Sequence, residues 1–226
     1  MLRKLIFFLF PLFLVQCEKT LPLPFGAEMR KIPVDSASNG KIDSMGYYIP
    51  ESENYRILYI EIDKDGNGSS DEFIWQGVAT LQDPKSPVKN MQKVHEQVDE
   101  NNDGKIDLIR WLLPNEIIAM VQKDSDRDGY FESVFYYNLK KKVVRRELDP
   151  NKKGKPSIFI FFDRAEIDSD EDGYPDLVVY GKSELELEEK AVNKRETKPL
   201  KKEDSLLLNP SKLPQTERPL LGSGMI

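Results

Sequence analysis

The sequence predicts an all-β fold, an antiparallel meander of repeated β-hairpins joined by acidic loops. The first observation is a short acidic frame that occurs in four well-formed copies along the 226 residues. The second is that the segments between the copies are rich in β-branched and aromatic residues, which favours strands. The third is the spacing, because loop starts at residues 35, 63, 99, 124, 149 and 168 include two intervals of 25 residues. Repeats of this size are typical of one supersecondary unit that is copied and stacked.

Strands are expected on both sides of each acidic loop. Plain turns close the other ends of the hairpins, for example at Pro114 and at the lysines 140–142. In such a meander all the acidic loops lie along one edge of the sheet. The periodicity leaves open whether the sheet stays open, folds into a sandwich or curls into a propeller-like ring. The predicted strands are residues 56–62, 73–75, 91–98, 108–113, 117–121, 133–137, 143–148, 158–162 and 177–180.

The N-terminal residues 1–17 are typical of a secretory signal. Two basic residues precede an apolar run that is too short for a membrane span of about 20 residues. The run ends at Cys17, the only cysteine of the chain, so no intramolecular disulfide can form. The motif Leu14-Val15-Gln16-Cys17 resembles the lipobox of bacterial lipoproteins, which implies that Cys17 is lipidated. An ordinary signal-peptide cysteine and an uncleaved anchor are the alternatives.

The rest of the chain divides into three parts. Residues 18–34 contain several prolines and little periodicity, which is typical of a tether. Residues 35–181 hold all the acidic loops and form the predicted hairpin domain. Residues 182–226 are dense in Glu, Lys and Pro, and we expect a charged, largely disordered tail apart from a short helix within 183–194.

The acidic loops have the composition of calcium sites. We number each loop from its first aspartate, so that positions 1, 3, 5 and 9 carry side-chain oxygens and position 6 is glycine. Calcium takes 6 to 8 oxygen ligands, and carboxylates at alternate positions of a tight loop converge on one ion. A backbone carbonyl at position 7, such as that of Tyr174, adds a further oxygen. The candidate ligands are Asp63, Asp65, Asn67, Asp71, Asp99, Asn101, Asp103, Asp107, Asp124, Asp126, Asp128, Glu132, Asp168, Asp170, Asp172 and Asp176.

The copies differ in quality. The loops at 168 and 124 offer the most carboxylates, and we expect them to bind calcium best. The loop at 35 has Ala37 in place of a ligand, which predicts weak binding or none. The loop at 149 has Lys153 at position 5, and we interpret it as a hairpin turn that has lost its metal. A metal-free reading of every loop also exists, because Asp, Asn and Gly are good turn residues.

The frame is not that of a helical EF-hand. An EF-hand has a bidentate Glu at position 12, where these loops have Ile74, Arg110, Phe135 and Val179. The pattern Asp-x-Asp-x-Asp-Gly-x-x-Asp followed by an apolar strand resembles the FG-GAP and VCBS repeats. The resemblance covers the loops and the strand after each, and it implies calcium bound in a β-hairpin.

Several function classes lack support in the sequence. A net charge of −6 without a basic face argues against a nucleic-acid partner. His95 is the only histidine, and a nucleophile elbow, a phosphate loop and a His-based triad are missing. Trp75, Trp111 and Tyr136, with Tyr137 and residues 159–162, are interpreted either as a recognition patch or as sheet core.

The sequence therefore predicts an exported, lipid-anchored calcium-binding protein that acts as a binding or structural module of the bacterial envelope. We expect the outer membrane or cell surface rather than the inner membrane. The expected partners are the membrane, through the lipid, and a protein or glycan ligand. The alternatives are a carbohydrate-active hydrolase that uses carboxylates outside the loops, and a metal-free β scaffold.

Overall fold

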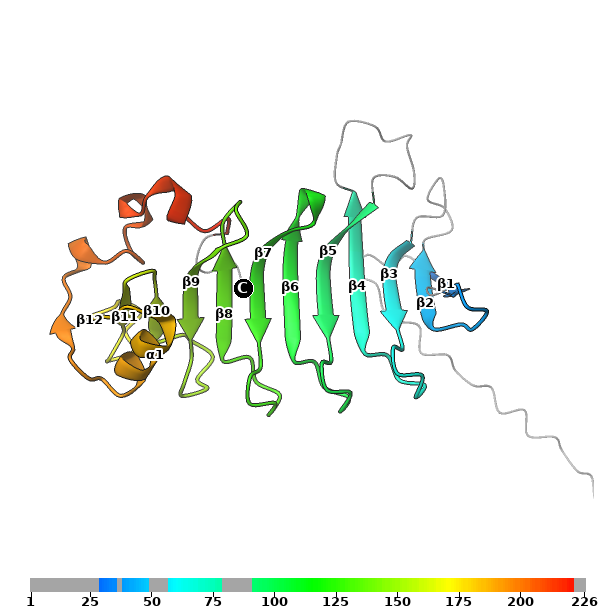
Figure 1. Ribbon diagram of the computed structural model, residues 1–226, viewed down its shortest axis with the longest axis horizontal. Coiled ribbons are helices and arrows are strands. Elements are labelled where there is room, and N and C mark those ends of the chain that lie inside the picture. The colour runs from blue at the N-terminus through cyan, green and yellow to red at the C-terminus, as the bar shows by residue number, and fades with distance from the viewer. Residues whose placement is uncertain (1–28, 36–37, 49–56, 79–90, 222–226) are drawn as a thin grey trace, which may run out of the picture.

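The computed structural model describes residues 29–35, 38–48, 57–78 and 91–221. In these residues thirteen antiparallel strands form one sheet, in which every strand pairs with its sequence neighbours (Figure 1). The predicted all-β meander is confirmed. The sheet stays open, with β1 and β13 as its two edges, so neither a sandwich nor a propeller-like ring is formed.

The strands are β1 (Arg30–Val34), β2 (Ser44–Tyr48), β3 (Ile57–Ile62), β4 (Glu72–Val78), β5 (Met91–Val98), β6 (Leu108–Leu113), β7 (Ile117–Lys123), β8 (Ser133–Tyr137), β9 (Val143–Leu148), β10 (Ile158–Ile160), β11 (Arg164–Ile167), β12 (Leu177–Tyr180) and β13 (Lys198–Pro199). The helical elements are α1 (Glu184–Val192) and the short turns η1 (Pro114–Glu116), η2 (Lys202–Asp204), η3 (Pro210–Lys212) and η4 (Gln215–Glu217). Among the described residues, none of these helices has the length and apolar character needed to cross a membrane.

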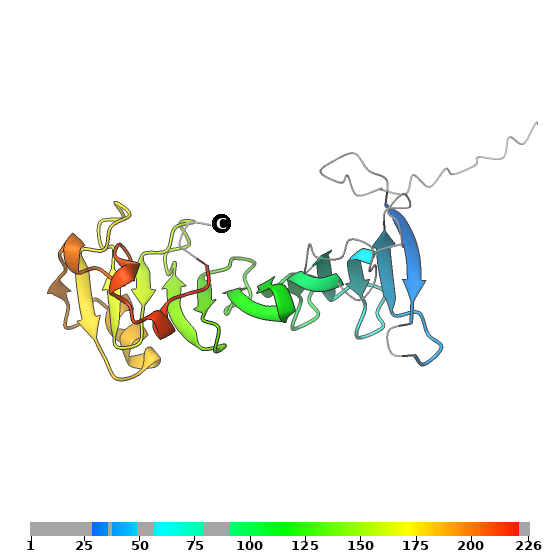
Figure 2. The ribbon, with the colours of Figure 1, turned by 90° about the horizontal axis from the view of Figure 1, so that it is seen from above.

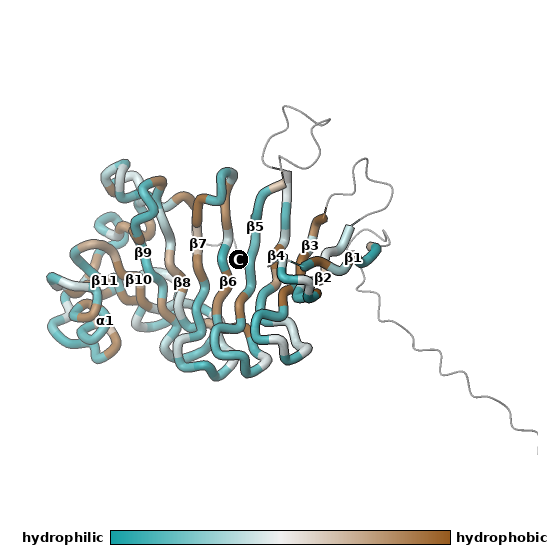
Figure 3. Tube along the Cα trace, turned by 45° about the vertical axis from the view of Figure 1, so that its right-hand side comes forward, coloured by the Kyte–Doolittle hydropathy of each residue, from teal (hydrophilic) through white to brown (hydrophobic). Residues whose placement is uncertain are grey.

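The acidic loops all lie on one edge of the sheet. Each connects an odd-numbered strand to the next, from β1 and β2 at the N-terminal end to β11 and β12 at the C-terminal end. Figure 1 shows them along the lower edge, and Figure 3 shows that this edge is hydrophilic while the strands above it carry the apolar residues. The local hairpin pattern in the sequence therefore determined where the candidate ligands gather.

The C-terminal end of the sheet is covered on both faces. Helix α1 packs Leu187 and Ala191 against a cluster that includes Ile160. Phe159 and Phe161 pack instead with Leu213. Because successive strand residues point to opposite faces, α1 and the segment 200–221 cover opposite sides of β10. Figure 2 shows this thick end beside the thinner middle of the sheet.

This packing corrects the prediction for residues 182–226. The expected short helix is present as α1, but the described residues 182–221 belong to the folded body rather than to a disordered tail. The reason is that a few apolar side chains, widely spaced among charged residues, each fill a place on the sheet. Leu187 is 1% exposed and Leu213 is 3% exposed. The average composition of the segment does not reveal such isolated contacts.

A buried carboxylate fastens this C-terminal segment. Glu166 on β11 is fully buried, and it accepts hydrogen bonds from Ser205 Oγ at 2.6 Å and from the backbone N–H of Leu206 at 2.7 Å. It also accepts from Leu207 N at 3.2 Å, and Arg164 Nη2 lies 2.7 Å from Glu166 Oε1. A buried charge is tolerated only when it is paired and hydrogen-bonded, and this one is both.

The N-terminal boundary also differs from the prediction. Residues 30–34 were expected to belong to the tether, but they form β1 and pair with β2 over its whole length. A strand of this kind is hard to detect in sequence, because it contains Pro33 and its side chains are mostly exposed. The predicted signal of residues 1–17, with Cys17, lies outside the described residues.

The middle of the sheet is held by cross-strand pairs. The ring of Tyr59 packs against that of Trp75 in a tilted arrangement with centroids 4.3 Å apart, and the rings of His95 and Trp111 pack in the same way at 4.2 Å. Trp75 is 37% exposed and Trp111 is 39% exposed, whereas Tyr136 is 1% exposed. The two tryptophans therefore lie at the surface of the sheet, and Tyr136 belongs to its core.

An ion-pair cluster lies on the other side of the same strands. Glu96 of β5 is buried and pairs with Lys93 and with Arg110 of β6. Desolvation acts to raise the pKa of Glu96, but its hydrogen bonds with Glu72, Lys93 and Arg110 outweigh that effect and lower the pKa to about 2. Glu96 is therefore an ionised group that links two central strands.

Candidate metal sites in the acidic loops

All six acidic loops share one backbone conformation. The glycine at position 6 has a φ between 81° at Gly154 and 95° at Gly129, and the residue at position 4 is also left-handed, from 53° at Lys152 to 76° at Gly66. Glycine adopts such angles without steric cost, which explains why position 6 is glycine in every copy. The repeated frame of the sequence thus specifies a repeated loop shape.

The aspartate at position 1 organises each loop. Asp168 accepts a hydrogen bond from the backbone N–H of Gly173 at 2.8 Å and one from that of Asp172 at 3.2 Å. The same bond to the glycine at position 6 occurs in the other five loops, at 2.6 Å to 2.8 Å. This bond keeps the loop tight and holds position 1 close to the turn.

Position 9 closes the loop from the other side. Asp176 accepts hydrogen bonds from Ser169 at the backbone nitrogen and at the hydroxyl, each at 2.7 Å. Equivalent bonds from the backbone N–H of position 2 reach Asp71 at 2.8 Å, Asp107 at 2.9 Å and Glu132 at 2.9 Å. Since a carboxylate has about four lone-pair sites, these bonds leave acceptor capacity for a cation.

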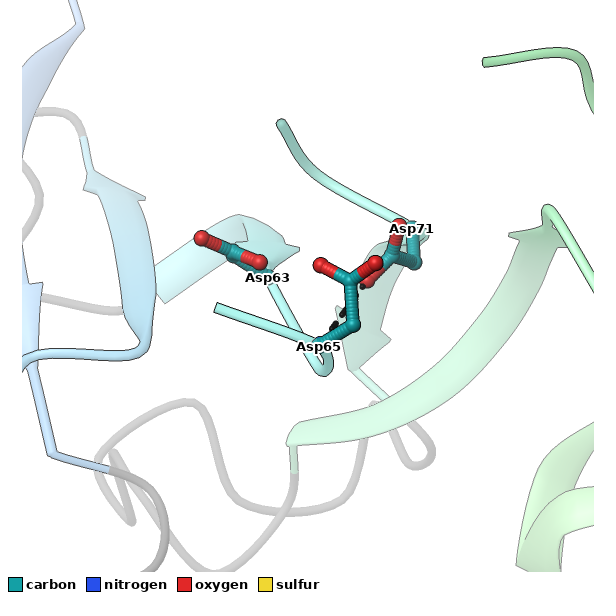
Figure 4. Close-up of side chains that lie close together, drawn as sticks. All are labelled: Asp63, Asp65 and Asp71. Atoms are coloured by element: carbon teal, nitrogen blue, oxygen red, sulfur yellow. Dashed lines mark hydrogen bonds between the residues drawn. The ribbon is translucent and has the colours of Figure 1, made fainter. Parts of the chain in front are cut away.

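Three of the loops bring three carboxylates together, so that one oxygen from each lies within 4.8 Å of the others. Each set combines positions 1, 3 and 9, and Figure 4 shows the one in the loop at 63. Oxygens at this separation can hold a metal ion. The sets are Asp63, Asp65 and Asp71; Asp124, Asp126 and Glu132; and Asp168, Asp170 and Asp176.

The remaining predicted ligands are placed differently. Position 5 is Asp128 or Asp172 in the loops at 124 and 168, and neither carboxylate belongs to the close set of its loop. In the loop at 63 position 5 is Asn67, whose side-chain oxygen accepts the N–H of Ser69 at 2.7 Å. Asp172 likewise accepts the backbone N–H of position 7, that of Tyr174, at 2.8 Å. In the loop at 99, position 3 is Asn101, whose amide hydrogen-bonds to Asp103 at 3.1 Å. The predicted ligands of that loop, Asp99, Asn101, Asp103 and Asp107, therefore do not form a set of three converging carboxylates.

Burial divides each loop into an inner and an outer half. Asp168 and Asp124, both at position 1, are 5% and 2% exposed, whereas the residues at positions 3 and 5 face solvent. Burial, with the nearby charge of Asp172, raises the pKa of Asp168. Burial acts in the same direction on Asp176, but hydrogen bonds from Ser169 outweigh it and lower that pKa. A cation bound beside Asp168 would relieve the cost of its buried charge.

The loops are bonded to one another in a row. The backbone N–H of position 1 donates to the carbonyl of position 9 in the preceding loop, for example Asp99 N to Asp71 O at 2.8 Å and Asp124 N to Asp107 O at 2.9 Å. The same bond joins Asp168 N to Ser157 O at 2.9 Å. This continuity cannot be predicted from the repeated frame, because it depends on the register between hairpins.

The donor set is of one chemical kind. Every group in the three sets is a carboxylate oxygen, which suits hard cations such as calcium and magnesium. His95, the only histidine, packs against Trp111 and contributes to none of them. These loops therefore provide oxygen sites, without the nitrogen or sulfur ligands of a zinc site.

Comparison with known proteins adds little to this geometry. No protein-family model matches the chain, and no curated protein matches it. A search of solved structures finds a likeness to the structure titled "Crystal Structure of TarM", with a TM-score of 0.34 and 10% sequence identity. The likeness covers 58% of this chain and 21% of that one.

Proposed function

We propose that this protein is a calcium-binding module of the bacterial envelope, exported and anchored by lipid at Cys17. The observation that carries the calcium proposal is the convergence of three carboxylates in each of three loops along one edge. The lipid anchor and the envelope location rest on the N-terminal sequence alone. We propose a binding or structural role rather than catalysis, with a protein or a glycan as the ligand.

Calcium is favoured over magnesium by ligand number. The loop at 168 brings three carboxylates together, and its frame contains a fourth at Asp172 and a backbone carbonyl at Tyr174, a supply of oxygens that suits the 6 to 8 ligands of calcium. Magnesium keeps several waters and uses one or two carboxylates. Extracellular calcium modules have dissociation constants on the order of 10⁻⁴ to 10⁻³ M, which suits an exported protein.

Calcium would also contribute to stability. Each of the three converging sets concentrates carboxylates whose mutual repulsion a divalent cation removes. Because the loops are hydrogen-bonded in a row, an ion in one loop also restrains its neighbours. Among the described residues, α1 and residues 200–221 cover the C-terminal end of the sheet and not its middle, so we expect the loop edge to matter most in the middle.

Calorimetric titration of the whole chain with calcium tests this proposal, together with Asp170→Asn. Asp170 belongs to a converging set, and its amide replacement retains the oxygen that accepts the N–H of Asp172. We expect one site to weaken by about tenfold or more, since ligand charge tunes affinity. Glu171→Gln is the matched control, because Glu171 pairs with Lys153 and is not a ligand. Absence of calcium heat in the wild-type chain would refute the proposal.

The two alternatives predict other outcomes. A metal-free scaffold predicts the same melting temperature with calcium and with chelator. A carbohydrate-active hydrolase predicts turnover of glycans that persists when the loop ligands are replaced. The anchor is tested separately by mass spectrometry of the Cys17 peptide and by the release of a Cys17→Ser variant from membranes.

A further inference from the structure

The loop at 149 has the shape of a metal loop without its ligands. Lys152 and Gly154 have left-handed φ angles of 53° and 81°, and Gly154 N donates to Asp149 Oδ2 at 2.7 Å. Positions 5 and 9 are Lys153 and Ser157, so Asp149 is the only carboxylate in the frame. A role as a hairpin turn does not explain why this loop carries lysines.

Lys152 places its ammonium on the neighbouring loop. Lys152 Nζ lies 2.7 Å from Asp126 Oδ2 and also contacts Asp128 Oδ2. These aspartates are positions 3 and 5 of the loop at 124, and Asp126 belongs to its converging set. A positive group of the chain itself is therefore bound to the outer carboxylates of a candidate metal loop.

A second contact runs in the opposite direction. Tyr130, at position 7 of the loop at 124, donates its hydroxyl to Asp149 Oδ2. The same hydroxyl accepts a hydrogen bond from Gly154 N at 2.9 Å. Tyr130 also supplies the backbone carbonyl expected to complete the metal site of its loop. Each of the two loops therefore contacts the other through a side chain, so a conformational change in one loop affects the other.

Other nearby lysines are bound elsewhere. Lys153 pairs with Glu171 at 2.7 Å, and Glu171 occupies position 4 of its loop, which is not a ligand position. Lys64 pairs with Glu72 at 2.6 Å, outside the loop at 63. Among the described residues, Lys152 is the lysine that contacts a converging carboxylate set from another loop.

We propose that Lys152 is a tethered counter-ion of the loop at 124, and that calcium enters this loop only as the Lys152 ammonium leaves. The inference rests on the proposed calcium function and assigns its regulation at one site. An ammonium and a divalent cation repel each other at ligand distance, and both use the Asp126 carboxylate. The loop at 124 therefore binds calcium less tightly than its carboxylate number suggests, and it fills after the loop at 168.

Lys152→Met tests the proposal, because methionine keeps an unbranched chain but removes the charge. Calcium binding is followed in the whole chain by the backbone amide signals of Gly129 and Gly173, one in each loop. We expect affinity at Gly129 to rise about 3- to 5-fold, in keeping with the strength of partly exposed ion pairs. Affinity at Gly173 should stay within about twofold. Lys153→Met is the matched control and should leave Gly129 unchanged.

A chemical measurement on the wild-type chain provides a second test. Lys152 should react slowly with an amine-acylating reagent without calcium, and faster as calcium fills the loop at 124. Lys155, in the same loop, should react at a constant rate. The proposal is overturned if the acylation rate of Lys152 does not change with calcium while the amide signal of Gly129 does.

The outcomes separate this proposal from the one on which it rests. Equal affinity at Gly129 in wild type and Lys152→Met, with a normal response at Gly173, overturns the counter-ion role and leaves calcium binding intact. No response at either glycine in any variant overturns calcium binding, and the counter-ion role with it.

Discussion

Replacement of Gly173 by alanine separates the two roles of the loop glycine, in backbone shape and in calcium binding. Gly173 has a φ of 91°, and a Cβ added there meets nothing within 4 Å. The cost is therefore backbone strain alone, about 1 to 2 kcal/mol for an L-residue in the left-handed region. For a chain of this size that corresponds to a fall in melting temperature of about 2 to 8 °C.

The control for this prediction is Gly154→Ala. Gly154 has a φ of 81°, and its Cβ would also meet nothing within 4 Å, but its loop lacks the ligands. In chelator, both variants should lose similar stability. With calcium at about 100 times the dissociation constant, one filled site adds about 2.7 kcal/mol, and Gly173→Ala should lose part of that gain.

Thermal unfolding with chelator measures the backbone strain, and thermal unfolding with calcium measures the stabilisation by the bound ion. The reasoning is refuted if Gly173→Ala loses less than about 0.5 kcal/mol in chelator, because the left-handed geometry would then carry no strain. An equal rise in melting temperature with calcium for both alanine variants would contradict the assignment of a metal to the loop at 168.

Three further predictions concern the sheet. Glu96→Gln should lower the free energy of unfolding by about 2 kcal/mol at neutral pH. Because the pKa of Glu96 is about 2 in the folded state and 4.5 in the unfolded state, its contribution to stability is present above pH 4.5 and is lost as the pH falls toward 2. The stability of the variant, measured by urea unfolding, should therefore depend less on pH in this range than that of the wild type. Glu166→Ala should cost about 3 to 5 kcal/mol and expose residues 200–221 to limited proteolysis, and a cleavage pattern like that of wild type would contradict its anchoring role. Leu187→Ala, at a side chain 1% exposed, should lower the free energy of unfolding by about 2 to 5 kcal/mol, whereas Leu185→Ala, 80% exposed, should stay within about 0.5 kcal/mol.

The sequence ranked the loops only in part. It favoured the loops at 168 and 124, whose carboxylates do converge, but it did not distinguish the loop at 63 from the loop at 99. The difference lies at position 3, where Asp65 supplies a carboxylate and Asn101 supplies an amide. A count of oxygen-bearing side chains treats the two alike, whereas their charge differs.

The contact of Lys152 with Asp126 could not be predicted from the sequence, for a different reason. The two residues lie 26 positions apart, and their approach depends on the register that aligns adjacent loops. In the sequence it is Lys153, and not Lys152, that stands at a ligand position. Lys152 stands at position 4, and its side chain extends from its own loop to the neighbouring loop at 124. This contact becomes visible only when the hairpins are placed side by side in the sheet.

The sequence by itself determined the hairpins, the loop shape and the edge on which the loops gather. These features are local: glycine at position 6 permits the left-handed turn, aspartate at position 1 binds its N–H, and alternating strands follow. Tertiary structure decided that the sheet stays open, that residues 182–221 pack against it, and that Lys152 reaches the loop at 124. These features depend on contacts between segments far apart in sequence, and neither composition nor periodicity encodes which segments meet.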